Sequence, residues 1–323
     1  MKKQAIQNNN TYKCWLMVSV LLGMLCLSAC ADITVGRGNR TDSQSLQPVT
    51  VEEVSVRVPG MEGEKRFLYL SDLHLIVESD QVAESEAETV HGRVGWSSYD
   101  GISAADSWKQ WVDYLNKEDT EGVLLGADMV DFASEANVSC LKAGLDELEH
   151  PFMYVRADHD TAPFYLDGVT NEDSKGYQDT ITPNDEVMLW EYEEFLIVGW
   201  NNSTENLSPA ALERMKEIFA MDKPIILLTH VPIKSLVDGS LATQSKEAWQ
   251  ERELTWGSGC YHYPDAVTWE FLEMIYAEDS PVVEILCGHL HFTWDGWVTQ
   301  TVHEHVFSPA FERCMGIITV SGE

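Results

Sequence analysis

Residues 65–75 read KRFLYLSDLHL, an apolar stretch that runs directly into an aspartate and a histidine. A short apolar run of this kind, bounded by polar residues, is typical of a buried strand. Asp72 and His74 follow at the point where the strand is expected to end. One such pair alone is more typical of a surface loop than of a ligand site, so its meaning depends on the rest of the chain.

Four further apolar strands are expected to end in the same kind of polar residue. They are GVLLGADMVD (122–131), FMYVRADHD (152–160), IILLTH (225–230) and VVEILCGHLH (282–291). Segments with helical features alternate with these strands, at 103–116, 136–149, 208–221 and 264–277, with Ser103 and Ser208 as predicted N-caps and Pro209 at a first helical position. This alternation predicts an α/β fold. Because ligands of open α/β sheets bind at the carboxyl ends of the strands, the polar ends are expected to converge.

The remaining segments predict more strands and no second linker. Strands are expected at 49–58, 296–307 and 314–322, and a two-stranded hairpin at 186–202. Residues 76–100 are acidic and irregular, which predicts a long surface loop and a candidate gate for the site. We therefore expect a single catalytic domain over residues 51–323.

The residue types at the strand ends favour a site with two metal ions. Imidazole combined with carboxylate suits zinc, manganese or iron, whereas calcium prefers oxygen ligands alone. Seven or eight such groups exceed what one ion needs, but two ions that share a bridging carboxylate would use them all. His303 and His305 also share one face of a strand, but nothing else supports them as ligands, and we interpret them as structural.

The ordered series resembles the calcineurin-like metallophosphoesterase superfamily, whose pattern is DxH, GDxxD, GNH(D/E), H and GHxH. The matching residues are Asp72-Leu73-His74, Asp128-Met129-Val130-Asp131, Asp158-His159-Asp160, His230 and Gly288-His289-Leu290-His291. The resemblance implies two mixed β-sheets packed face to face, with helices on the outside and the site at one edge. It implies that Asp72, His74 and His291 hold one metal ion, that Asp158, His230 and His289 hold the other, and that Asp128 bridges them.

The same resemblance implies a metal-dependent phosphoesterase that hydrolyses a phosphomonoester or a phosphodiester. A hydroxide that bridges the two ions would attack phosphorus. His159 would face the phosphate as an acid or charge stabiliser, and Asp160 is a candidate to orient its ring. Two alternatives stay open: an inactive scaffold of this fold that binds a ligand or partner at the surface, and a solute-binding lipoprotein.

Two positions depart from the family pattern. Ala127 stands where the family usually has glycine before the bridging aspartate, which is a small change unless the backbone angles require glycine. Asp158 stands where the family has a neutral asparagine, and it adds a negative charge to the cluster. We expect tighter retention of the second ion, or a preference for a more highly charged ion such as ferric iron.

The first residues predict an exported lipoprotein. Lysines precede an apolar run that is short for a membrane span, and the run ends in Leu27-Ser28-Ala29-Cys30, which looks like a bacterial lipobox. Residues 1–29 are the predicted signal peptide, Cys30 the lipidated residue and 30–50 a tether, so that only the lipid would hold the protein at a bacterial membrane. The net charge of −32 argues against a nucleic-acid-binding surface.

Two questions of detail stay open from the sequence. Cys140, Cys260, Cys287 and Cys314 show no CxxC spacing, which argues against a cysteine zinc site but leaves disulfide pairing undetermined. Arg93, Arg156 and Lys234 are candidates to meet a phosphate, and Trp256 and Tyr261 are candidates to stack on a ring, although each is more typical of a surface or packing residue.

Overall fold

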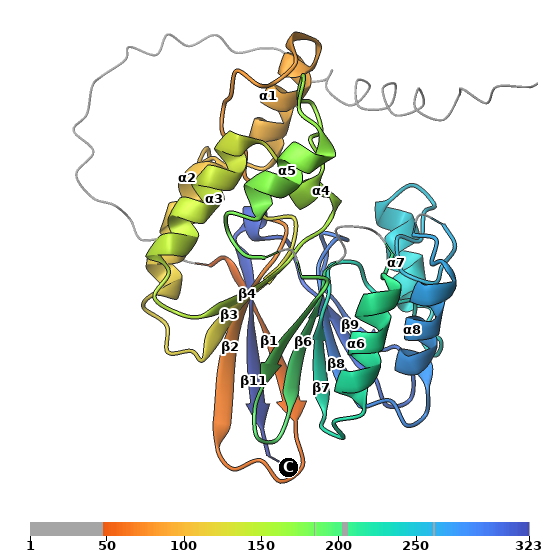
Figure 1. Cartoon of the computed structure of the whole chain (residues 1–323). Coiled ribbons are helices and arrows are strands. Elements are labelled where there is room, and N and C mark those ends of the chain that lie inside the picture. Colours follow the sequence, from red (N-terminus) through yellow and green to blue (C-terminus); the bar gives the residue numbers. More distant parts are fainter. Residues whose placement is uncertain (1–47, 184, 202–205, 261, 323) are drawn as a thin grey trace, which may run out of the picture. The chain divides into compact units, whose positions relative to one another are not determined.

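The computed structural model describes residues 48–183, 185–201, 206–260 and 262–322 (Figure 1). The predicted signal peptide, Cys30 and most of the predicted tether lie outside these residues, as does Tyr261. The described residues belong to one compact unit, Ser45–Glu323. Within the described ranges, no helix has the length and hydropathy needed to cross a membrane.

The fold contains two mixed β-sheets. The first has the strand order β1 (Thr50–Arg57), β11 (Cys314–Ser321), β2 (Glu64–Leu70), β3 (Gly122–Gly126) and β4 (Phe152–Val155). The second has the order β5 (Val187–Glu191), β6 (Leu196–Trp200), β7 (Ile225–Leu228), β8 (Val282–Cys287), β10 (His303–Val306) and β9 (Trp294–Trp297). Strands β2, β3 and β4 run parallel, as do β6, β7 and β8. Their carboxyl ends therefore lie at common sheet edges.

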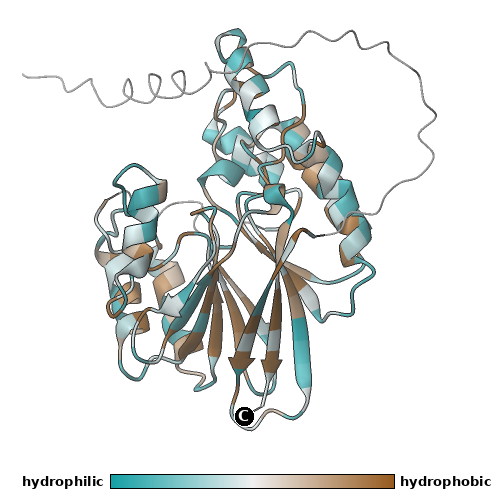
Figure 2. Ribbon diagram, turned by 180° about the vertical axis from the view of Figure 1, so that it is seen from behind, coloured by the Kyte–Doolittle hydropathy of each residue, from teal (hydrophilic) through white to brown (hydrophobic). Residues whose placement is uncertain are grey.

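Alternating side chains explain why the two sheets pack face to face. In β2, Phe67 and Tyr69 point into the core between the sheets, whereas Leu68 and Leu70 join the core under the helices. In β7, Ile226 and Leu228 join the same inter-sheet core. Apolar residues on both faces of a strand are what burial between two layers requires. Figure 2 shows that the strands are coloured mainly as hydrophobic.

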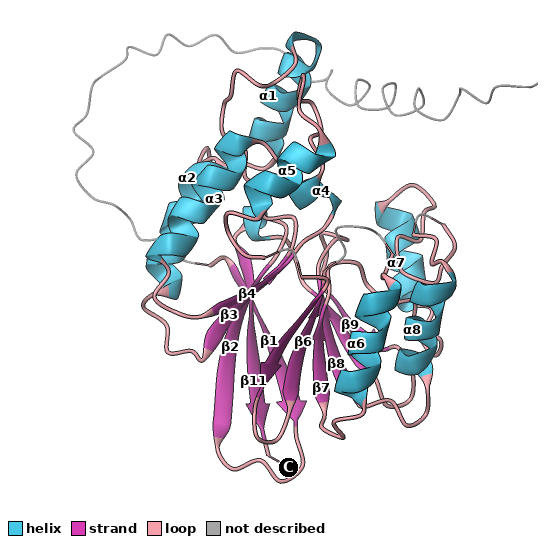
Figure 3. Cartoon of the chain, viewed as in Figure 1, coloured by secondary structure: helices cyan, strands magenta, loops and turns pink. Residues whose placement is uncertain are grey.

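Helices cover the outer faces of the sheets and complete four layers (Figure 3). Helices α2 (Ala104–Leu115) and α3 (Glu135–Glu147) cover the first sheet, and α6 (Pro209–Phe219) and α8 (Ala266–Tyr276) cover the second. The predicted caps are present: the hydroxyl oxygens of Ser103 and Ser208 accept hydrogen bonds from the amides of Asp106 and Ala211. The predicted α/β fold of two face-to-face mixed sheets with outer helices is confirmed.

The prediction of a long loop at 76–100 is wrong. This segment contains the short helix η1 (Glu84–Glu86) and the helix α1 (Ala87–Trp96). Val90 is the only fully buried residue of α1, so the helix lacks the broad apolar stripe that reveals a helix in a sequence. Three further helices were not predicted: α4 (Asp158–Thr161), α5 (Asn171–Gln178) and α7 (Ser240–Ala248).

His303 and His305 have structural partners. The His303 ring pairs with Glu284, with Nδ1 3.1 Å from both carboxylate oxygens. Nε2 of His305 lies 2.8 Å from the carboxylate of Glu52, which connects β10 of the second sheet to β1 of the first. The four cysteines in the described part of the chain are free thiols.

Candidate metal centre

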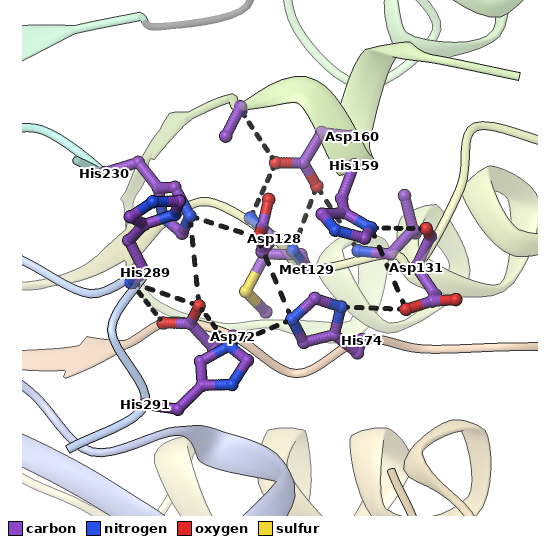
Figure 4. Close-up of polar contacts among 12 residues, drawn as sticks. Asp72, His74, Asp128, Met129, Asp131, His159, Asp160, His230, His289 and His291 are labelled. Atoms are coloured by element: carbon purple, nitrogen blue, oxygen red, sulfur yellow. Dashed lines mark hydrogen bonds and ion pairs between the residues drawn. The ribbon is translucent and has the colours of Figure 1, made fainter. Parts of the chain in front are cut away.

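The ends of five strands carry the predicted ligands, and Figure 4 shows six of them, Asp72, His74, Asp128, His230, His289 and His291, close together. Asp72 and His74 follow β2, Asp128 follows β3, and Asp158 begins α4 just after β4. On the second sheet, His230 follows β7, and His289 and His291 follow β8. The parallel course of these strands explains the convergence that the sequence predicted.

The ligand candidates form two adjoining clusters. Asp72, His74 and His291 form the first, in which the carboxylate oxygen Oδ1 of Asp72 lies 3.2 Å from Nε2 of His291. Asp128, His230 and His289 form the second, in which Oδ2 of Asp128 lies 3.0 Å from Nε2 of His230.

Asp128 lies between the two clusters. Its Oδ2 atom is also 3.8 Å from Nε2 of His74, which belongs to the first cluster. Asp158 groups with Asp128 and His159 at a spacing that suits a metal ion, and not with His230 and His289, the partners that the resemblance implied. This arrangement gives Asp128 the position expected of a bridging carboxylate.

The histidine rings are oriented as metal ligands usually are. Nδ1 of His74 donates to the carboxylate of Asp131 at 2.9 Å, and Nδ1 of His230 donates to the Gly126 carbonyl at 2.7 Å. Such a bond fixes the ring and directs the other nitrogen, Nε2, toward the metal position. Oδ1 of Asp128 is buried without a hydrogen-bond partner among the described residues, a cost that a bound cation would remove. The residues therefore fit a pair of metal ions.

The charge of the site also favours cations. Burial alone would lower the pKa of His230, but Asp128 and Asp72 outweigh it and raise the pKa to about 10. Burial would raise the pKa of Asp72, but His230 and His291 lower it to about 2. Without metal, Asp128 and Asp72 therefore keep the His230 ring protonated. A metal ion that binds His230 must displace that proton.

Several ligand candidates adopt the left-handed backbone region. The φ angles are 55° at Asp72, 50° at Asp128 and 70° at His289. Ala127 has φ of 73°, so its backbone lies where glycine is favoured, and the substitution of the family glycine is not free of strain. Non-glycine residues in this region cost about 1–2 kcal/mol each, and such strain is typical of functional sites.

Asp160 does not orient His159, which corrects the role we expected for it. The Asp160 carboxylate is buried and accepts hydrogen bonds from the amides of Asp128, Met129, Val130 and Ala157, and from the Tyr154 hydroxyl. Nδ1 of His159 instead donates to the Asp131 carbonyl at 2.6 Å. Asp160 therefore holds the loop that carries Asp128, and Asp131 positions His159.

His159 lies beside the clusters and reaches solvent, with 24% of its side chain exposed. Its ring centroid is 4.7 Å from that of His74. Burial lowers the pKa of His159, but the carboxylates of Asp128, Asp158 and Asp131 outweigh it and raise the pKa above its ordinary value. The ring can therefore carry a proton next to the metal positions.

Sequence reasoning missed His262 and did not anticipate the contacts that Asp131 and Arg93 make. Asp131 was noted only as part of a motif, yet it contacts both His74 and His159. Arg93, a candidate phosphate contact in the sequence, lies on the helix that we predicted as a loop and donates two hydrogen bonds to the Asp131 carboxylate. Nε2 of His262 lies 3.4 Å from Nε2 of His289. His262 follows no strand, so the neighbouring sequence did not predict its place beside the ligands.

The other substrate-contact candidates in the described part of the chain contact residues outside the two clusters. Arg156 is buried and donates to the carbonyls of Gln178 and Thr182. Trp256 is buried and stacks on Trp200, with 5.3 Å between the ring centroids. Nζ of Lys234 lies 3.9 Å from the carboxylate of Glu253. None of these contacts involves a cluster residue.

Replacing Gly288 with alanine should weaken metal binding by about 10- to 100-fold. A Cβ atom at this position would meet the Asp72 carboxylate and the Ser71 hydroxyl, so the buried carboxylate would have to shift. Titration with Mn²⁺ would measure the change. Gly176→Ala is the matched control, because a Cβ there has nothing within 4 Å. Equal affinity in both variants would contradict the assignment of Asp72 as a ligand.

Fold and site together define an α/β sandwich protein with two adjoining carboxylate–imidazole clusters at its strand ends. A family model described as calcineurin-like phosphoesterase matches residues 65–292, well over half of the chain. The chain therefore belongs to the calcineurin-like phosphoesterases, a superfamily of metal-dependent phosphoesterases. No curated protein sequence matches the chain.

Three solved structures are similar to this chain at low identity. A dimetal phosphatase from Danio rerio is 13% identical with a TM-score of 0.48, and the match covers 77% of this chain and 88% of that one. Phosphopantetheinyl hydrolase from Mycobacterium tuberculosis is 12% identical with a TM-score of 0.40, covering 77% and 91%. Purple acid phosphatase PPD1 from yellow lupin (Lupinus luteus) is 15% identical with a TM-score of 0.45, covering 82% and 45%.

Proposed function

We propose that this protein hydrolyses a phosphomonoester or a phosphodiester with two metal ions, which are manganese, iron or zinc. The observation that carries the proposal is the position of Asp128 between two carboxylate–imidazole clusters. Asp72, His74 and His291 would hold one ion, and Asp158, His230 and His289 the other. Two such ions, when bound, supply Lewis-acid polarisation of the phosphoryl oxygens and lower the pKa of water.

The chain's own residues have separate tasks in this reaction. His159 would donate a proton to the departing oxygen or stabilise its charge, because its pKa is raised and its ring is accessible. The Asp131 carbonyl accepts from Nδ1 of His159, so the Nε2–H is the group available to the leaving group. Asp160 acts at a distance, by holding the loop that carries Asp128.

The alternative of an inactive binding scaffold is less well supported. All seven predicted ligand positions carry a carboxylate or an imidazole, and the supporting hydrogen bonds of His74 and His230 are present. A pure binding function would not require this complete set or the Asp131–His159 contact.

The direct test combines metal analysis with turnover. The purified protein would be stripped of metal, reloaded separately with Mn²⁺, Zn²⁺ or iron, and assayed with a chromogenic phosphomonoester and a phosphodiester. We expect two ions per chain and metal-dependent hydrolysis of at least one ester. Stable binding of two ions without turnover under any of these conditions would favour the scaffold.

Replacing Asp158 with asparagine should lower affinity for the more weakly held ion by about ten-fold, because ligand charge tunes metal affinity. The effect should be larger for ferric iron than for Mn²⁺, since the lost charge acts in proportion to the charge of the ion. The number of metal ions that stay bound per chain during dialysis against a chelator would measure the loss of affinity. Equal retention by the native protein and the variant would show that the negative charge of Asp158 has no role.

We also propose that the protein is exported and anchored to a bacterial membrane through lipid on Cys30. The lipobox-like residues Leu27-Ser28-Ala29-Cys30 after an apolar run support this proposal. Incorporation of a labelled fatty acid into the native chain, and its loss in Cys30→Ser, is the expected result. Equal labelling of both chains would refute it.

A further inference from the structure

A cavity of about 310 Å³ opens beside the metal centre. It is lined by Val49, Thr50, Trp96, Tyr99, Phe311 and Glu312, among others. This volume lies at the lower end of the range of small-molecule sites. None of the predicted ligands lines it, so the cavity is separate from the clusters themselves.

Two aromatic walls of the cavity are shared with the metal centre. The Trp96 ring centroid lies 5.2 Å from that of His74 and 5.6 Å from that of His291. The Phe311 ring lies 5.3 Å from the His291 ring. A molecule with a phosphoryl group at the metal centre can therefore extend over these rings into the cavity.

The Trp96 ring is held in place but keeps an open surface. The Arg93 guanidinium lies 4.4 Å from the centre of the ring, and the Phe311 ring lies 4.6 Å away. Arg93 is itself fixed by its two hydrogen bonds to Asp131. Trp96 nevertheless stays 42% exposed, which is unusual for a large aromatic side chain. A fixed, exposed ring is a ready stacking surface.

We propose that this cavity binds the organic group of the substrate, and that this group contains a planar apolar ring. The inference rests on the proposed phosphoesterase function and adds the class of ester. The exposed Glu312 carboxylate at the cavity disfavours a second negative charge on the ring. The ring is an aryl group or a neutral heterocycle, rather than one that carries a further phosphate.

Phosphonates that are not hydrolysed test the cavity apart from catalysis. Benzylphosphonate should bind the Mn²⁺-loaded protein at least about ten-fold more tightly than methylphosphonate, because the ring buries apolar surface. A benzylphosphonate with a 4-carboxylate should lose most of this advantage. Isothermal titration calorimetry gives the three affinities.

Substitutions at the cavity then test whether it is the source of the preference for benzylphosphonate. Thr50→Trp should fill the cavity and abolish the preference for benzylphosphonate, while the affinity for methylphosphonate changes less than about two-fold. Ser55→Trp is the matched control, on an exposed part of the same strand, and should keep the preference. Trp96→Ala, which removes the stacking ring, should also reduce the preference for benzylphosphonate.

The outcomes separate this inference from the proposed function. Equal affinity for the two phosphonates, or a preference that survives in Thr50→Trp, would overturn the ring-binding cavity even if esters are hydrolysed. A preference that Thr50→Trp removes, in a protein that hydrolyses no ester, would support the cavity and refute the hydrolase.

Discussion

Replacing His159 with glutamine should lower kcat by about 10²- to 10⁴-fold while both metal ions stay bound. The ring lies next to the clusters, but its Nδ1 donates to the Asp131 carbonyl and it is not one of the predicted metal ligands. Glutamine cannot carry a proton, whereas the raised pKa of His159 favours a protonated ring. The substitution leaves Asp72, His74 and Asp128 in place, so the loss should appear in the chemical step.

Single-turnover kinetics and metal analysis of the same preparation would measure this effect. A substrate with a good leaving group needs less protonation, so an aryl ester should lose less rate than an alkyl ester in the variant. His91→Gln is the control, because His91 is an exposed histidine on α1, whereas His159 lies on α4. If His159→Gln lost its metal ions, His159 would be a ligand and its proposed role would be wrong.

The convergence of the ligands was predictable because it depends on local patterns. Apolar strands such as 67–70 and 225–228 end abruptly in aspartate or histidine, and parallel strands must place their ends at a common edge. The packing of two sheets face to face was implied only by the family resemblance, although the continuous apolar runs of β2 and β7 are what burial on both faces requires.

The supporting contacts were not predictable because they join residues far apart in the chain. Asp160 accepts from amides near residue 129, about thirty residues earlier, and a sequence pattern carries no sign of such a bond. Arg93 reaches Asp131 from a helix without an apolar stripe. The left-handed backbone of Ala127 is likewise imposed by the surrounding loops, since alanine itself disfavours it.

Asp160→Asn should destabilise the protein by about 2–6 kcal/mol and weaken metal binding, in contrast to the change at His159. Oδ1 of Asp160 accepts from Met129, Val130 and Tyr154, and Oδ2 accepts from Asp128 and Ala157. An asparagine has one oxygen, so its NH₂ group would face at least two donors. Each buried donor left without an acceptor costs about 1–3 kcal/mol.

The charge of Asp160 is present at neutral pH, so the native carboxylate can accept all these bonds. Burial and the nearby Asp128 raise the pKa of Asp160 to about 6, although Tyr154 and the amides of Ala157 and Val130 favour the ionised form. Denaturant unfolding would measure the loss of stability, and Mn²⁺ titration the loss of affinity.

Tyr154→Phe provides the graded comparison for this prediction. It removes only the hydroxyl that donates to Oδ1 at 2.6 Å and leaves the amide bonds to Asp160 intact. Its cost should be about 1 kcal/mol, with metal affinity close to native. If Asp160→Asn instead kept native stability and metal content but lost turnover, Asp160 would take part in the reaction itself. Because Asp160 holds the Asp128 loop, we expect instead that stability and metal affinity fall, and that turnover is lost as a consequence.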